Sequence, residues 1–208
     1  MIGASADSAD IAALVARSGM DARGADGEPA TAIEYRVDAE RTVRLLAAAL
    51  AALHGTKLSD GERRAGLAAT DLASDAVGAF GAGTLQHSER SGAYAHMSDE
   101  RLVDALVAGA EGAAARQSRQ VLTHGTPTLS HLWCDHGSVV GLISWDRPAV
   151  ADPYRDLAVA ARCIATDMAP ILVPTFFEHY GESSPDPVRI DWYALLAELV
   201  GSGGTAAA

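Results

Sequence analysis

The sequence predicts a mostly helical α+β fold with one small β-hairpin. Two long segments, 38–54 and 99–119, place apolar residues at helical spacing behind good N-cap residues. Between 132 and 145, two short strand-like runs flank a turn that contains Gly137, which can supply the positive φ of a hairpin turn. Of the 208 residues 49% are hydrophobic, so the chain can bury a core of domain size.

Residues 1–37 are expected to form an N-terminal extension. They are rich in Ala, Gly, Ser and Asp, and contain one short helix near 9–17 that begins at Ser8 or Asp10. The run Gly-Ala-Asp-Gly-Glu-Pro at 24–29 is typical of a linker. No alternating apolar pattern indicates a strand in this part of the chain.

The helix over 38–54 has Asp38 as its N-cap and ends at His54, where a histidine favours the helix dipole. Residues 55–97 are expected to give a Gly/Ala-rich helical stretch and then a partly ordered loop. Four acids of this region are expected on the solvated surface: Asp60, Asp71, Asp75 and Glu89. The helix over 99–119 has Ser98 as N-cap and directs three side chains inward: Leu102, Leu106 and Val107.

A formal net charge of −11 disfavours binding to nucleic acid or to an anionic membrane, and suits a cationic ligand. The two cysteines, Cys134 and Cys163, are too few for a disulfide framework, which favours a reducing cytoplasm. The first twenty residues have no basic leader pattern, and the apolar run 45–53 is too short to span a bilayer. We therefore expect a cytoplasmic protein.

The stretch 121–158 contains the motifs of the chain. It reads Leu-Thr-His-Gly-Thr-Pro at 122–127, then the hairpin, then Ala-Asp-Pro-Tyr-Arg-Asp-Leu-Ala at 151–158. In order and spacing it resembles the catalytic core of the bacterial aminoglycoside 3′-phosphotransferases, enzymes with a kinase-like fold. The resemblance extends over about residues 38–200, since 158–168 and 176–200 resemble the drug-facing and closing helices of that family.

This resemblance implies that 38–200 form the C-terminal lobe of the kinase-like fold, followed by a flexible tail at 201–208. The family's N-terminal lobe, a sheet with a nucleotide loop and a phosphate-contacting lysine, is expected to be missing. About forty residues stand in its place, and Lys57 is the only lysine in the sequence.

Three positions that carry the chemistry in the family differ here. Thr126 stands where the family has its catalytic Asp, His131 where it has a metal-binding Asn, and Ser144 where it has a metal-binding Asp. A threonine hydroxyl is no general base near neutral pH, and losing two oxygen ligands weakens a Mg²⁺ site. The resemblance thus implies a pseudokinase that is not an active phosphotransferase and uses no cofactor.

Other motif positions are kept. By resemblance, Asp156 accepts hydrogen bonds from the backbone of the catalytic loop, and Asp152 caps the helix that begins at 153. Arg147 is expected to pair with Asp152 or Asp156. The drug-facing helix has Thr166 and Asp167 where the family has two acids. The residues expected to contact a ligand are Arg147, Trp145 and Asp167.

The spacing of His124, His131, Cys134 and His136 suggests a metal site, but a structural interpretation is favoured because a strand would point its side chains to opposite faces. In that interpretation His124 braces the loop, Cys134 packs as a small apolar residue and His136 is exposed. Asp146, two residues after Ser144, is a possible substitute ligand.

Several functions agree with these observations. The favoured one is a catalytically dead pseudo-phosphotransferase that binds a small molecule or a protein partner in the vacated cleft. Alternatives are an ATP-independent enzyme acting on a secondary metabolite through His131, His124 and Asp146, a residual kanamycin-type aminoglycoside O-phosphotransferase, and a decayed remnant. A homodimer or a separate partner is expected, because an open boundary would leave apolar residues uncovered: Leu132, Trp133, Leu142 and Trp145.

Overall fold

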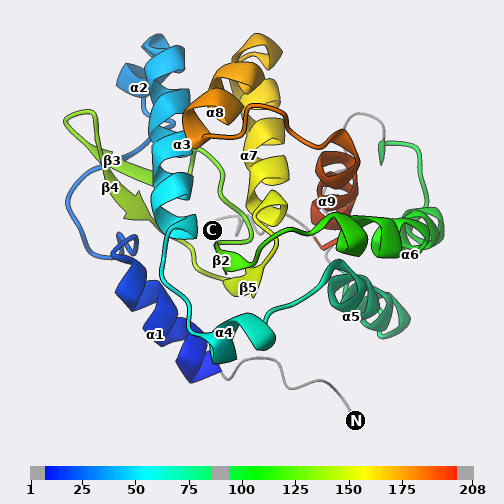
Figure 1. Ribbon diagram of the computed structural model, residues 1–208. Helices are drawn as coiled ribbons and strands as arrows, with labels where there is room; N and C mark the ends of the chain where they lie inside the picture. Colours follow the sequence, from blue (N-terminus) through cyan, green and yellow to red (C-terminus); the bar gives the residue numbers. More distant parts are fainter. Residues whose placement is uncertain (1–7, 86–93, 201–208) are drawn as a thin grey trace.

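The computed structural model describes residues 8–85 and 94–200 (Figure 1). The helices are α1 Ser8–Ser18, α2 Ile33–Val37, α3 Ala39–His54, α4 Asp60–Arg64, α5 Ala69–Gly81, α6 Asp99–Arg116, α7 Tyr154–Asp167, the 3₁₀ helix η2 Pro170–Leu172, α8 Val173–Tyr180 and α9 Pro187–Val200. The strands are β1 Glu28–Pro29, β2 Val121–Thr123, β3 Leu132–Asp135, β4 Ser138–Leu142 and β5 Ala149–Ala151. The prediction of a mostly helical α+β fold is confirmed.

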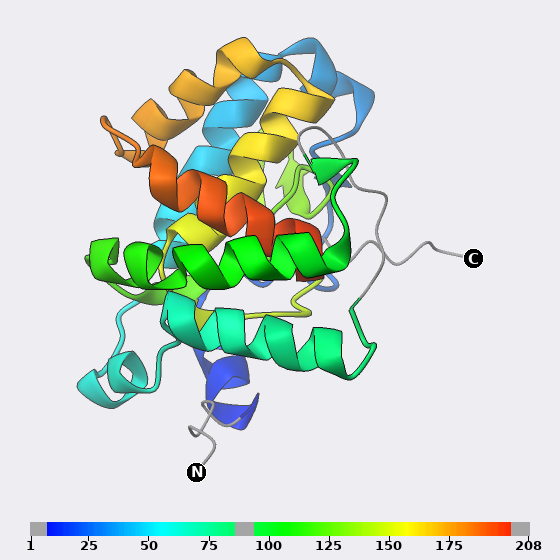
Figure 2. The same cartoon turned by 90° about the vertical axis from the view of Figure 1, so that its right-hand side faces the viewer.

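The helices form two groups on either side of a two-stranded antiparallel sheet of β2 and β5. Helix α3 packs on α8, while α9 packs on both α7 and α6, and α5 lies against α6. Figure 2 shows α5, α6 and α9 as successive layers, seen from the side opposite the hairpin. Every residue of β2 is buried. The small sheet therefore lies in the middle of the core and fixes where the following loop starts.

Helices α3 and α6 begin as their caps predict. The Asp38 carboxylate accepts a hydrogen bond from the amide of Arg41, and the Ser98 hydroxyl accepts one from Arg101. Helix α6 ends at Arg116, three residues earlier than predicted. Leu102 and Leu106 are fully buried, but Val107 is 49% exposed, so its predicted inward position is wrong. The residue after Leu106 already points away from the core, because successive helical residues turn by about 100°.

The predicted hairpin is present, with a two-residue turn at His136 and Gly137. Both have positive φ, 46° and 74°, which is the backbone of the tight turns that suit the strand twist. Strand β4 ends at Leu142, three residues before the predicted end at 145. The cause is Ser144, whose φ of 61° takes the chain out of the extended conformation.

The N-terminal extension contains the predicted helix, α1, but residues 24–29 are not the linker that their composition suggests, and the residues around them are paired with the hairpin. The carbonyl of Met20 accepts a hydrogen bond from the Leu142 amide at 2.6 Å, and the Ala22 amide donates to the Leu142 carbonyl at 2.9 Å. Strand β1 pairs with β3. Backbone pairing across a long sequence separation leaves no local apolar pattern, so composition alone could not predict it.

This pairing closes the boundary that was expected to be open. Leu132 and Leu142 are fully buried, and only Trp133 and Trp145 of the four expected apolar residues stay half-buried. The core is continuous from the extension to α9, since Leu14, Met20 and Ala30 belong to the same cluster as the buried residues of α3 and α7. The prediction of an uncovered apolar patch at Leu132 and Leu142 is wrong.

The segment after α3 is more regular than predicted. Helix α4 begins with a capping box in which Ser59 and Glu62 bond each other's backbone amides. Asp60, Asp71 and Asp75 are exposed, as predicted, whereas Glu89 and residues 201–208 lie outside the described residues. Within the described ranges, none of the helices has the length and apolar character needed to span a membrane.

Candidate functional site

The candidate site is the loop from His124 to His131, which connects β2 to the hairpin. Its start is fixed because β2 pairs with β5, with Thr123 opposite Ala149, and the Thr123 hydroxyl also donates to the Ala149 carbonyl at 2.9 Å. At Gly125, φ is 95°, and an added Cβ would lie 2.7 Å from the Arg147 carbonyl. Only glycine fits this turn without displacing neighbouring backbone.

Asp156, in the first turn of α7, anchors this loop as predicted. Its Oδ1 accepts the Gly125 amide and its Oδ2 accepts the His124 amide, both at 2.7 Å. A fully buried carboxylate costs much free energy unless it is paired or hydrogen-bonded. The anchor therefore fixes the loop and satisfies the carboxylate at the same time.

His54 completes the anchor, in a role that the sequence did not predict. Its Nε2 lies 3.1 Å from Asp156 Oδ2, and its Nδ1 lies 2.8 Å from the hydroxyl of Tyr180, which also accepts a bond from Arg119. His54 lies in the last turn of α3, as predicted, but its side chain is buried and bonded to Asp156 and Tyr180, which the sequence did not predict. Burial raises the pKa of Asp156, but the hydrogen bond from His54 and nearby positive charge outweigh it, so the pKa lies below its ordinary value.

His124 braces the loop from inside, as predicted. Its Nδ1 accepts the Thr126 amide at 3.3 Å, so its Nε2 carries the hydrogen and donates to the Ile143 carbonyl at 2.8 Å. Burial lowers the pKa of His124 more than the charge of Asp156 raises it. The imidazole is thus held neutral between the loop and the end of the hairpin.

The three altered motif positions lie around this brace. Thr126 is 4% exposed, and its hydroxyl has no hydrogen-bond partner among the described residues. The Thr126 carbonyl accepts a bond from His131 Nδ1 at 2.5 Å, and the rings of His131 and His124 are 5.6 Å apart. Ser144 is half-buried, and its carbonyl accepts the amide of Asp146, whose side chain is exposed.

The predicted partners of Arg147 are taken by other residues. The Arg189 guanidinium forms a buried ion pair with Asp152, with Nε 3.1 Å from Oδ2, and lies 3.8 Å above the Tyr154 ring. Asp152 also accepts the Tyr154 amide at 2.8 Å, although α7 begins at Tyr154, one residue later than predicted, with Pro153 as its N-cap. Because Asp152 pairs with Arg189 and Asp156 with His54, the predicted ion pair of Arg147 is wrong.

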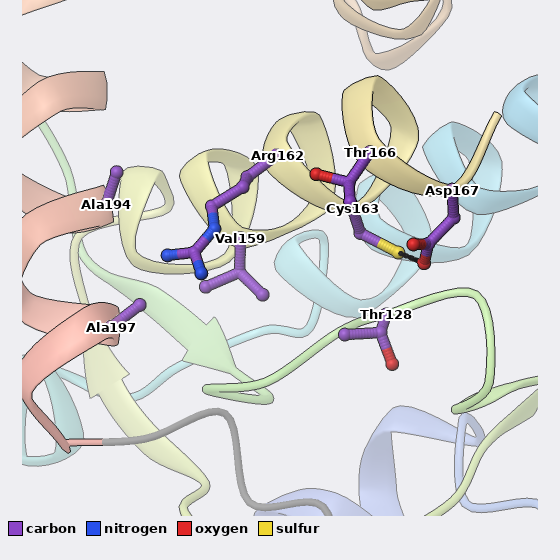
Figure 3. Close-up of a pocket in the computed structure, with 8 residues that line it drawn as sticks. All are labelled: Thr128, Val159, Arg162, Cys163, Thr166, Asp167, Ala194 and Ala197. Atoms are coloured by element: carbon purple, nitrogen blue, oxygen red, sulfur yellow. Dashed lines mark hydrogen bonds between the residues drawn. The ribbon is translucent and has the colours of Figure 1, made fainter. Parts of the chain in front are cut away.

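A cavity of about 180 Å³ lies beside the loop, between α7 and α9 (Figure 3). Thr128 of the loop forms one wall, and Asp167 accepts a bond from the Cys163 thiol at 3.1 Å. Burial raises the pKa of that thiol to about 12, which makes it a poor nucleophile. The other lining residues are Val159, Arg162, Thr166, Ala194 and Ala197.

The three residues predicted to contact a ligand do not share one cavity. Asp167 lines the cavity just described, whereas Arg147 lines a second one between α5 and α9. The Trp145 ring lies 4.7 Å from the His124 ring, tilted by 54°, and Trp145 Nε1 donates to the Leu142 carbonyl. Its contacts are with the loop and the hairpin.

The four candidate metal ligands are also separated. His124 and His131 are neighbours, but the Cys134 side chain is buried in β3 and His136 is exposed in the turn. Within the ranges that the structure describes, no group of three or more His, Cys, Asp and Glu side chains could hold a metal ion.

Sequence reasoning missed Arg119, Tyr180 and Arg189, which complete the buried polar contacts of the anchor and of Asp152. Tyr180 lies 126 positions from His54 in the sequence, so no motif spacing could connect them. For Arg189 a weak signal existed, since an arginine that is buried by a mostly apolar helix needs an acid as partner.

Comparisons with known proteins agree with this geometry. The model of the phosphotransferase enzyme family matches residues 13–193. An aminoglycoside 3′-phosphotransferase of Escherichia coli is 35% identical over 79 residues, which are 38% of this chain and 29% of that enzyme. One from Streptomyces fradiae is 31% identical over 102 residues, which are 46% of this chain and 38% of that enzyme.

The matched stretches thus span less than half of the length of these curated relatives. Among solved structures, aminoglycoside phosphotransferase APH(3″)-Id of Streptomyces rimosus superposes with a TM-score of 0.71 and 22% identity, over 84% of this chain and 67% of that one. At that identity the superposition shows a common fold.

Proposed function

Because the chain belongs to the phosphotransferase enzyme family, we propose that it is a member that has lost phosphate transfer and binds a small molecule. The observation that carries the proposal is the arrangement of Thr126, His131 and Ser144. By their resemblance to the family's motifs, these residues stand for the catalytic Asp and the two metal ligands. Thr126 and His131 lie in the loop that Asp156 anchors, and Ser144 follows β4.

Thr126 offers no base for a substrate hydroxyl. A general base must lie within hydrogen-bond reach of the proton that it removes and must have an accessible basic form. The Thr126 side chain is almost fully buried, and its carbonyl is occupied by His131. Both features argue against proton removal at this position.

The remaining positions fit a magnesium nucleotide poorly. Mg²⁺ takes oxygen ligands in octahedral geometry, whereas His131 offers nitrogen and its Nδ1 is engaged with the Thr126 carbonyl. Ser144 offers a neutral hydroxyl from a backbone with φ of 61°. Phosphoryl transfer depends on charge neutralisation at the phosphates, and none of these three residues provides a negatively charged metal ligand.

A small molecule is favoured over a protein partner or a second copy of the chain. The expectation of a homodimer rested on an exposed apolar surface. Residues 20–30 cover that surface, so that Leu132 and Leu142 are fully buried. Cavities remain on both sides of α9, one of them beside Thr128 of the loop. A small molecule that binds in such a cavity needs no exposed apolar surface on the protein.

Two measurements test the proposal. The first is thermal unfolding of the protein in the presence of Mg·ATP, and the second is mass spectrometry of kanamycin after incubation with the protein and Mg·ATP. Mg·ATP at a hundred times its Kd would add about 2.7 kcal/mol to the free energy of unfolding. This corresponds to a rise of the melting temperature by roughly 5–10 °C for a chain of this size. We expect no shift of the melting temperature and no phosphorylated kanamycin. Stabilisation by Mg·ATP together with phosphorylated product would overturn the proposal and favour a residual aminoglycoside phosphotransferase.

A further inference from the structure

The second cavity lies between α5 and α9, apart from the loop, and has a volume of about 250 Å³. Its walls are apolar over most of their extent: Leu72, Ala76, Ala79, Leu85, Leu196 and Val200. Two arginines, Arg147 and Arg155, line it as well.

Arg155 is half-buried, and the hydrogen-bond partners of its guanidinium within the described residues are neutral. Its Nη1 donates to the Thr123 hydroxyl at 2.7 Å and its Nη2 donates to the Arg147 carbonyl at 2.8 Å. Among the described residues it forms no ion pair, and neighbouring Asp156 is engaged with His54 and the loop amides. Burial lowers the pKa of Arg155, and the negative charge of Asp156 offsets this effect only in part.

Arg147 is half-buried, and its guanidinium has no hydrogen-bond or ion-pair partner within residues 8–85 and 94–200. The carboxylates that could have paired with it, Asp152 and Asp156, are held by Arg189 and His54. A guanidinium offers five N–H donors in a planar fork that matches a carboxylate. At least one arginine of the cavity therefore has its donors available.

We propose that this cavity binds a small organic acid, with its carboxylate at Arg147 and Arg155 and its apolar body against Leu72, Leu196 and Val200. The inference rests on the proposed small-molecule function and gives that molecule a chemical class. Ligand cavities commonly measure roughly 300–1,000 Å³, so a volume of about 250 Å³ suits a single ring or a short chain.

The charges around the cavity agree with an anionic ligand. Asp75 is the acid among its lining residues, and it is exposed, so solvent and salt screen its charge. The cavity beside Thr128 differs, because its lining includes the acid Asp167, and its arginine, Arg162, forms an ion pair with Glu198. The site for the organic acid is therefore assigned to the α5–α9 cavity.

Calorimetric titration of the full chain with benzoate, and with the neutral amide benzamide, tests the charge requirement. We expect saturable binding of benzoate with a millimolar or lower Kd, and binding of benzamide at least tenfold weaker. Arg147→Met keeps much of the apolar stem and should weaken benzoate at least tenfold. Arg44→Gln removes an arginine on α3 that pairs with Glu40, and should leave benzoate affinity unchanged.

A pair of substitutions on α5 tests the location. Ala79 lines the cavity, so Ala79→Phe should fill it and abolish benzoate binding, whereas Val77 is 41% exposed and Val77→Phe should leave binding intact. Thermal unfolding of each variant shows whether it is folded. Equal affinity for benzoate and benzamide, equal binding by the two α5 variants, or no saturable binding of benzoate up to about 20 mM would overturn the inference. Phosphorylation of kanamycin would overturn the proposed function without altering this titration, so the two proposals fail separately.

Discussion

Thr123 and Thr126 are three positions apart in the sequence, and their hydroxyl groups differ in hydrogen bonding. Both residues are buried. The Thr123 hydroxyl donates to the Ala149 carbonyl and accepts from Arg155, whereas the Thr126 hydroxyl has no partner among the described residues. A buried hydroxyl without a partner loses its hydrogen bonds to water and gains nothing in exchange.

Replacing each threonine by valine should therefore have opposite effects on stability. Thr126→Val removes an uncompensated hydroxyl, so we expect the free energy of unfolding to stay the same or to rise by up to about 1 kcal/mol. Thr123→Val leaves the half-buried guanidinium of Arg155 with one acceptor fewer and should cost about 1–3 kcal/mol. Urea unfolding of both variants measures the difference. A loss for Thr126→Val as large as that for Thr123→Val would show that its hydroxyl has a stabilising partner.

For single residues, the sequence predicted a role only where the residue and its hydrogen-bond partners lie in the same motif. Asp156 was assigned through the loop that it anchors, because both lie within one motif. The contacts of His54 were not predicted, since its partners Asp156 and Tyr180 are remote in sequence and its surroundings depend on how α3, α7 and α8 pack. Arg147 was misjudged for a related reason, because Arg189 competes for the same carboxylate.

Among the elements, the long helices could be predicted from apolar periodicity and caps, and the paired short strands could not. Helix α3 follows from Asp38 and its apolar face. Strand β1 has only two residues and is a strand only because its backbone pairs with β3. Nearly every residue type can make such backbone hydrogen bonds, with proline as the main exception. Elements whose stability lies in remote backbone pairing leave little trace in the local sequence.

Gly141 provides a test of the pairing between β4 and residues 20–22. A Cβ at this position would lie 2.5 Å from the Met20 carbonyl oxygen, a backbone atom that cannot rotate away. We expect Gly141→Ala to destabilise the protein by about 1–3 kcal/mol and to speed hydrogen exchange at the amides of Ala22 and Leu142. Gly112→Ala, in α6 with open space around it, should instead stabilise the protein by about 0.5–1 kcal/mol. Unchanged exchange in Gly141→Ala would contradict this packing.

For the whole molecule, the neutral state of His124 makes stability depend on pH. Because the pKa of His124 lies below 6.5 in the folded chain, the unfolded chain binds more protons once the pH falls below about 6.5. Stability should then decrease with falling pH, until the folded histidine is protonated as well. Asp156, whose folded pKa is also lowered, adds a loss of the same sign below pH 3.8.

The contribution of His124 can be isolated by measuring the free energy of unfolding between pH 5 and 7. His124→Asn removes the titrating group, so its stability should depend less steeply on pH than that of the unaltered chain, by up to about 1.4 kcal/mol per pH unit. His136→Asn changes a histidine whose side chain is 96% exposed and should leave the slope unchanged. Identical slopes for all three proteins would show that His124 is not held neutral.

The pairing of residues 20–30 with both strands of the hairpin also has a consequence for the order of folding. Glu28 pairs with Cys134, a residue roughly a hundred positions later in the chain, so this contact closes a long loop and forms slowly. During synthesis, residues 20–30 emerge well before β3 and β4 exist. Until they dock, the strand edges that they later cover are open to other chains, and these edges are where association between nascent molecules would begin.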